Sequence, residues 1–77
     1  MCKPTVYSRP SCVQCKLTKD LMVREGIPFN EINVEEDAEA LAFVKSLGYE
    51  AAPVVVAGDQ HWVGFRPERV KGLNPRD

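Results

Sequence analysis

Several features are scarce in this sequence of 77 residues, and each absence excludes a class of protein. No apolar run approaches the roughly 20 residues that a membrane-spanning helix needs, and the amino terminus lacks an apolar signal segment. Ten basic and eleven acidic residues leave a net charge of -1, which gives no electrostatic reason to bind nucleic acid or an anionic membrane. We therefore expect a cytoplasmic protein whose partners are proteins or small molecules.

Cysteine is also scarce, with three residues in the chain. An odd number at this low density argues against a secreted scaffold in which every cysteine is paired. A chain this short buries only about 60% of its extended surface on folding, so its core must be regular to be stable. We expect one globular domain over residues 1–77 that is a monomer.

Apolar periodicity and turn residues divide the chain into seven elements. A β-prone run predicts a first strand over Cys2–Tyr7, and the spacing that begins at Cys12 predicts a helix ending at Gly26. The same reasoning predicts a strand over Ile27–Val34, a helix from Glu35 to Gly48, strands at Pro53–Ala57 and Gln60–Val63 joined by Gly58-Asp59, and a short helix within Arg66–Leu73.

The helix predictions rest on the spacing of apolar residues. In the first helix, apolar residues recur at every fourth position, at Val13, Leu17 and Leu21, with Met22 beside them; in the second they recur at every third position, at Leu41, Val44 and Leu47.

The predicted order β-α-β-α-β-β-α contains no linker or internal repeat, so the helices should cover the faces of one sheet. A right-handed crossover makes the first two strands parallel, whereas the closing hairpin is antiparallel. The predicted fold is therefore α/β, a four-stranded mixed sheet with three helices. Residues that follow the first strand then lie at the edge where open α/β sheets usually bind their ligands.

The motif Cys12-Val13-Gln14-Cys15 lies at the junction of the first strand and the first helix. Amide groups at a helix N-terminus stabilise a thiolate and lower a cysteine pKa from about 8.5 toward about 3.5–7.5. Cys12, at or beside the N-cap, is therefore the predicted nucleophile. Cys15, one turn later on the same face, is the predicted resolving thiol that attacks Cys12 once that sulfur is held in a mixed disulfide.

Structural zinc is the alternative use of this cysteine pair. Such a site needs four ligands, and only Cys2 and His61 remain to complete it. Neither belongs to a second paired motif, so a non-catalytic zinc-binding module is the least favoured function and no metal is expected. Cys2 is interpreted as a small apolar residue or a peripheral thiol open to oxidation, and His61 as a partly exposed polar residue on the outer face of the hairpin.

Three segments together resemble one protein family over almost the whole chain. They are Val6–Cys15 with its Cys-Val-Gln-Cys motif, Ala52–Val55, and the Trp-Val-Gly-Phe-Arg-Pro sequence of Trp62–Pro67. In this combination the sequence resembles the NrdH-redoxins, which are glutaredoxin-like members of the thioredoxin superfamily. It departs from that pattern at Arg9, where lysine is common, and at Val63, where serine is common.

The resemblance implies a thioredoxin-like fold and a dithiol electron carrier that reduces protein disulfides and forms a Cys12–Cys15 disulfide. It implies electron supply to class Ib ribonucleotide reductase, recharging by thioredoxin reductase, and no bound cofactor. It also implies a cis peptide bond before Pro53. The residues that it assigns to substrate or partner contact are Val13, Gln14, Ala52, Pro53, Trp62, Gly64, Phe65 and Arg66.

Two alternatives stay open at this point. Trp62 and Phe65 could serve ordinary core packing, and a mixture of packing and docking is expected. A glutathione-dependent glutaredoxin would have nearly the same fold and chemistry. Glutaredoxins generally carry a Gly-Gly and acidic segment after the last strand, whereas Gly64 is followed here by bulky Phe65 and cationic Arg66, which favours the first function.

Overall fold

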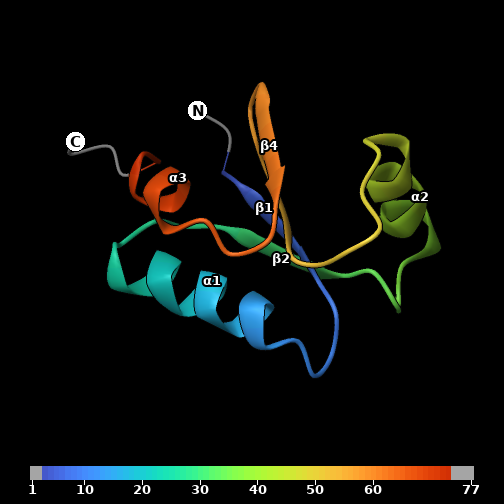
Figure 1. Ribbon diagram of the computed structural model, residues 1–77, viewed down its shortest axis with the longest axis horizontal. Helices are drawn as coiled ribbons and strands as arrows, with labels where there is room; N and C mark the ends of the chain where they lie inside the picture. The colour runs from blue at the N-terminus through green and yellow to red at the C-terminus, as the bar shows by residue number, and fades with distance from the viewer. Residues whose placement is uncertain (1–2, 74–77) are drawn as a thin grey trace.

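The computed structural model describes residues 3–73 and contains seven elements in the predicted order. They are β1 (Thr5–Ser8), α1 (Val13–Arg24), β2 (Asn30–Asn33), α2 (Ala38–Ser46), β3 (Val54–Ala57), β4 (Gln60–Val63) and α3 (Pro67–Lys71). The predicted fold class is confirmed, because these elements form one mixed sheet with helices on its faces (Figure 1).

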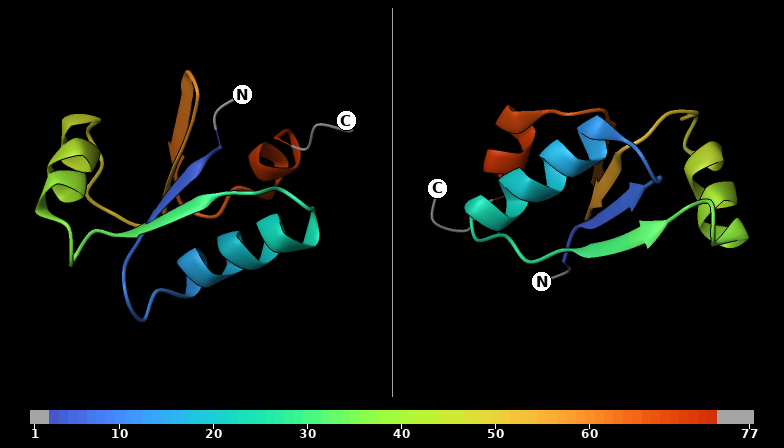
Figure 2. Two further views of the ribbon diagram at one scale, coloured as in Figure 1. Left: turned by 180° about the vertical axis from the view of Figure 1, so that it is seen from behind. Right: turned by 90° about the horizontal axis from the view of Figure 1, so that it is seen from below.

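The sheet has the strand order β2-β1-β3-β4, so β1 and β3 are central. β1 is parallel to β2, whereas β3 is antiparallel to both β1 and β4. Helices α1 and α3 lie together on one face, and α2 lies on the other (Figure 2). The carboxyl end of β1 leads directly into the loop that precedes α1.

Each face of the sheet has its own apolar cluster. On the α1 and α3 face the buried residues are Val6, Leu21, Met22, Ile27, Val55, Trp62 and Val70. On the α2 face they are Val34, Ala40, Val44 and Val54. Burial of a side chain of this size contributes about 1.5–3 kcal/mol, so both faces supply substantial stabilisation.

Several element boundaries differ from the predicted ones. β1 runs to Ser8 because this residue pairs with Asn33 of β2, while the predicted start at Cys2 lies outside the described residues. β2 is shorter than predicted because the Ile27 amide donates to the Met22 carbonyl, which places Ile27 in the turn that follows α1. α2 begins later than predicted, since Asp37 is its N-cap and accepts from the Ala40 amide.

The apolar residues whose spacing predicts the helices are only partly buried. Val13 and Leu17 are 73% and 44% exposed, whereas Cys15 and Thr18 are buried beside Leu21 and Met22. Thr18 can be buried because its hydroxyl donates to the Gln14 carbonyl at 2.9 Å. In α2, the buried residues are Ala40 and Val44, while Leu41 borders solvent.

Candidate active site

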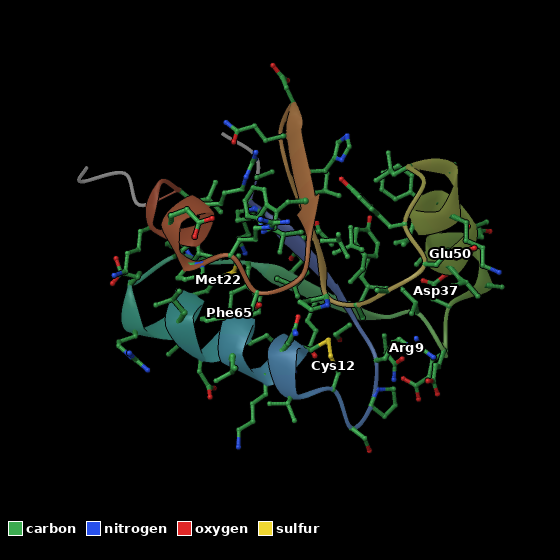
Figure 3. The ribbon with its side chains drawn as sticks, viewed as in Figure 1. Arg9, Cys12, Met22, Asp37, Glu50 and Phe65 are labelled. Carbon is green, nitrogen blue, oxygen red and sulfur yellow. A yellow bond between two sulfur atoms is a disulfide. The ribbon has the colours of Figure 1, made fainter. Side chains whose placement is uncertain are left out.

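Cys12 is the N-cap of α1, and its sulfur lies at the start of that helix (Figure 3). The backbone amide of Cys15 donates to Cys12 Sγ at 3.1 Å. The two cysteines are joined by a disulfide, with their Cα atoms 5.2 Å apart. In the reduced protein, the same amide would face a thiolate at Cys12, which is the charge that a helix N-terminus stabilises.

The two cysteine residues differ in exposure. Cys15 is 1% exposed, whereas Cys12 is only partly buried. Ser11, just before Cys12, has a φ of 59° in the left-handed region, which is uncommon for a residue other than glycine. This turn joins the loop after β1 to the first turn of α1.

A polar cluster near the cysteine pair joins α1 to β1 and β2. The Ser8 hydroxyl donates to Glu31 Oε2 at 3.0 Å, and Lys19 Nζ lies 2.6 Å from the same oxygen. The hydrogen bond from Lys19 is the main reason that the pKa of Glu31 is lowered from its ordinary value of 4.5. These three residues and both cysteines line an open cavity of about 810 Å³. The sequence interpretation missed this cluster, whose only local signal is the placement of Lys19 one turn after Cys15.

Three segments that are distant in the sequence meet beside the cysteine pair. The Ala52–Pro53 peptide bond is cis, as the family resemblance predicts. The Gly64 amide donates to the Pro53 carbonyl at 2.8 Å, which extends the ladder between β3 and β4. The Phe65 amide donates to Gln14 Oε1 at 3.3 Å. Hydrogen bonds thus join four of the predicted contact residues in two pairs, Gly64 with Pro53 and Phe65 with Gln14.

Comparison with known proteins identifies the family. A family model described as Glutaredoxin matches residues 5–62. The chain is 44% identical to the glutaredoxin-like protein NrdH of Escherichia coli K12, over 92% of this chain and 88% of that protein. It is 42% identical to NrdH of Lactococcus lactis subsp. cremoris, over 90% of this chain and 96% of that protein.

Solved structures agree with the sequence comparison. The NrdH-redoxin of Escherichia coli, a glutaredoxin-like protein with a thioredoxin-like activity profile, superposes with a TM-score of 0.93 at 42% identity. That alignment covers 96% of this chain and 97% of the other. A glutaredoxin of Archaeoglobus fulgidus gives 0.77 at 30% identity, over 95% and 86% of the two chains.

This chain is an NrdH-redoxin of the glutaredoxin family. Its Cys12–Cys15 pair is that of a thiol–disulfide oxidoreductase. The thioredoxin-like fold predicted from the resemblance is confirmed by the same structural comparison.

Three predicted contact residues of the redoxin differ in their burial and contacts, namely Trp62, Phe65 and Arg66. Trp62 is 4% exposed and belongs to the core cluster under α1, while Phe65 is partly buried against the same cluster. The guanidinium of Arg69 lies 5.4 Å from the Trp62 ring centroid, and the indole N–H has no hydrogen-bond partner within residues 3–73. Arg66 is the N-cap of α3, and its Nε donates to the Val63 carbonyl at 3.4 Å.

A second cavity, of about 730 Å³, lies between α2 and the sheet and reaches Ala52. Tyr7 and Val44 are among the side chains that line it. The pKa of Tyr7 is raised above 10.0, first by burial and then by the charge of Asp37. Arg9 and Glu35 also line this cavity and form an ion pair at 3.6 Å. Because both side chains are about half exposed, this ion pair contributes little stability.

The remaining sequence predictions concern metal and membrane. Across residues 3–73, no group of three or more His, Cys, Asp or Glu side chains is placed to hold a metal ion. His61, predicted to be partly exposed, is exposed, and its Nδ1 lies 2.7 Å from the Tyr49 hydroxyl. Cys2, the fourth ligand of the zinc alternative, lies outside the described residues. Within the described range, none of the helices is long and apolar enough to cross a membrane.

Proposed function

We propose that this redoxin supplies electrons to a class Ib ribonucleotide reductase and is recharged by thioredoxin reductase. The observation that carries the proposal is the unequal pair at the start of α1, with Cys12 partly exposed and Cys15 buried. The relative from Escherichia coli, with its thioredoxin-like activity profile, supports the choice of a thioredoxin-like reductant. The reducing cytosol is the compartment in which such a dithiol would work.

The proposed order of the two thiolate attacks follows from the positions of Cys12 and Cys15. The Cys12 thiolate attacks one sulfur of the partner disulfide, forming a mixed disulfide and releasing the other partner sulfur as a thiolate. The Cys15 thiolate then attacks Cys12 Sγ, which breaks the mixed disulfide and releases the second partner thiolate. Two electrons pass to the partner, whose two thiolates take up the protons that the two redoxin thiols lost. Recharging by thioredoxin reductase reverses these changes in the redoxin.

The partner is proposed to dock on the residues that surround Cys12. Val13 is exposed beside the nucleophile, and Ala52, Gly64 and Arg66 are at least partly exposed on the neighbouring loops. Pro53 and Trp62 are buried, so we assign them the support of this surface. Gln14 and Phe65 connect the loops to the helix that carries the cysteines.

A coupled assay tests the reductant. NADPH consumption is followed with thioredoxin reductase, this redoxin and insulin as the disulfide substrate, and in parallel with glutathione and glutathione reductase. We expect turnover in the first system, none with Cys12→Ser, and a trapped mixed disulfide with Cys15→Ser. Faster turnover in the glutathione system would favour the glutaredoxin alternative, and full activity of Cys12→Ser would refute the mechanism.

A second assay tests the acceptor. A class Ib ribonucleotide reductase is given a ribonucleoside diphosphate, NADPH and thioredoxin reductase, with the redoxin or its Cys12→Ser variant. Deoxyribonucleotide formation should require the wild-type redoxin. Equal formation with the variant would show that this reductase is not its acceptor.

A further inference from the structure

The Gln14 side chain is the direct link between the cysteine-bearing helix and the loop that follows β4. Its Oε1 accepts from the Phe65 amide, and the preceding amide in the chain, that of Gly64, donates to the Pro53 carbonyl. Two adjacent backbone N–H groups of one loop thus donate to different elements. The N–H of Phe65 donates to α1, and that of Gly64 donates to the loop before β3. No other side-chain hydrogen bond within residues 3–73 joins α1 to this loop.

The geometry fixes how the Gln14 amide is turned. Because the Phe65 N–H is a donor, the carbonyl oxygen of the side chain must face it, and the NH₂ group points elsewhere. The Gln14 backbone is held as well, since its carbonyl accepts from the buried Thr18 hydroxyl at 2.9 Å. Only the side-chain torsions of Gln14 are therefore left to adjust.

We propose that Gln14 is a positioning residue that holds the Gly64–Phe65 loop in its docking geometry and thereby sets the affinity for protein disulfides. This inference rests on the proposed function. A protein partner that docks at Cys12 excludes water from the loop, and a Phe65 N–H without an acceptor would then lose its hydrogen bond to solvent. A loop that is already ordered also reduces the entropy lost when the partner binds.

The chemical step at sulfur makes no use of this contact. The amide that faces Cys12 Sγ belongs to the backbone of Cys15, and it is present whatever side chain stands at position 14. Loss of the Gln14 carbonyl should therefore weaken partner binding and leave the reactivity of Cys12 toward a small disulfide unchanged. A protein substrate and a small substrate thus separate the two effects.

The experiment compares Gln14→Met, Gln14→Glu and Gln60→Met. Methionine removes the acceptor at similar length, glutamate restores an acceptor, and Gln60, on the exposed end of the hairpin, receives the same change without this contact. Insulin reduction driven by dithiothreitol gives KM and kcat. The rate with the small disulfide 5,5′-dithiobis(2-nitrobenzoic acid) gives the reactivity of Cys12, and hydrogen exchange gives the protection of the Phe65 and Gly64 amides.

For Gln14→Met we expect KM for insulin to rise about threefold to tenfold, the change that one net hydrogen bond represents, with kcat and the small-disulfide rate unchanged. Exchange of the Phe65 amide should become faster while the Gly64 amide stays protected. Gln14→Glu should restore KM and Phe65 protection, and Gln60→Met should match the wild type.

Unchanged Phe65 exchange in Gln14→Met would overturn the proposal, as would a parallel fall in the small-disulfide rate. Failure of the proposed function gives a different result. No turnover with thioredoxin reductase or with the class Ib ribonucleotide reductase would refute that function, while insulin reduction driven by dithiothreitol and the exchange data would still decide the role of Gln14.

Discussion

Replacement of Gly64 by alanine tests whether the loop beside the cysteine pair depends on its backbone conformation. Gly64 has a φ of 87°, where an L side chain costs about 1–2 kcal/mol. The added Cβ would lie 3.5 Å from Gln14 Oε1, an ordinary van der Waals contact, so steric clash adds little. Alanine also restricts the unfolded chain, which offsets about 0.4–1 kcal/mol. A net loss of about 1 kcal/mol corresponds to a melting temperature lower by about 4–8 °C.

Gly48 provides the matched control for this substitution. Its φ is 91°, and an added Cβ would meet no atom within 4 Å. Gly48→Ala should therefore lower the melting temperature by a similar amount. Gly48 follows α2, so a backbone shift that the alanine causes there should not move the loop that carries Phe65. Only Gly64→Ala should also raise KM in insulin reduction. Thermal unfolding followed by circular dichroism and the insulin assay measure the two effects.

Two results would refute this reasoning. An unchanged melting temperature for Gly64→Ala would show that the loop adapts without strain. An equal rise in KM for the two variants would show that the effect on activity comes from lower stability, and not from the position of the Gly64–Phe65 loop.

Three further predictions concern the core, the polar cluster and the nucleophile. Met22 is fully buried, so Met22→Ala should cost about 2–5 kcal/mol in urea unfolding, whereas Val23→Ala, at a position 70% exposed, should change stability by less than about 0.5 kcal/mol. Equal losses would contradict the assigned packing. Because Lys19 lowers the pKa of Glu31 in the folded state, the stability that this carboxylate adds is present above its unfolded pKa of 4.5 and is lost as pH falls through the folded pKa. Glu31→Gln should thus be slightly less stable than wild type at neutral pH and equal to it in acid, and a melting-temperature difference that persists in acid would contradict this. In the folded, reduced protein, iodoacetamide should modify Cys12 and spare Cys15, which is 1% exposed, as peptide mass mapping would show; modification of both at similar rates would contradict their unequal burial.

The order of the elements could be predicted because its signals are local. Gly26 follows the end of α1, and the Gly58-Asp59 pair marks the hairpin between β3 and β4. The buried face of α1 could not be predicted in this way, because Leu17 and Thr18 are adjacent and spacing alone favours the apolar one. Thr18 is buried because its hydroxyl is satisfied by a backbone carbonyl, which no periodicity reveals.

The same distinction between local and long-range signals applies to the site. The cysteine pair is a local motif, and its place at the start of a helix follows from four neighbouring residues. The contact of Gln14 with Phe65 joins residues 51 positions apart, and that of Ser8 with Glu31 joins residues 23 positions apart. Such pairs depend on strand register and on how α1 lies against the sheet. The family resemblance placed Gln14 and Phe65 at the site, but only the structure shows that they bind each other.

The arrangement of the core explains how so short a chain can tolerate a bond that must be made and broken in every cycle. On the chain-entropy account, a disulfide between residues 12 and 15 closes a very short loop and stabilises the fold by only about 2 kcal/mol. Neither apolar cluster includes Cys12 or Cys15, and the clusters lie on opposite faces of the sheet. The bond that reduction breaks therefore joins no two members of either cluster. The fold can be held by side-chain burial in both redox states, which leaves the free energy of the disulfide available for exchange with a partner.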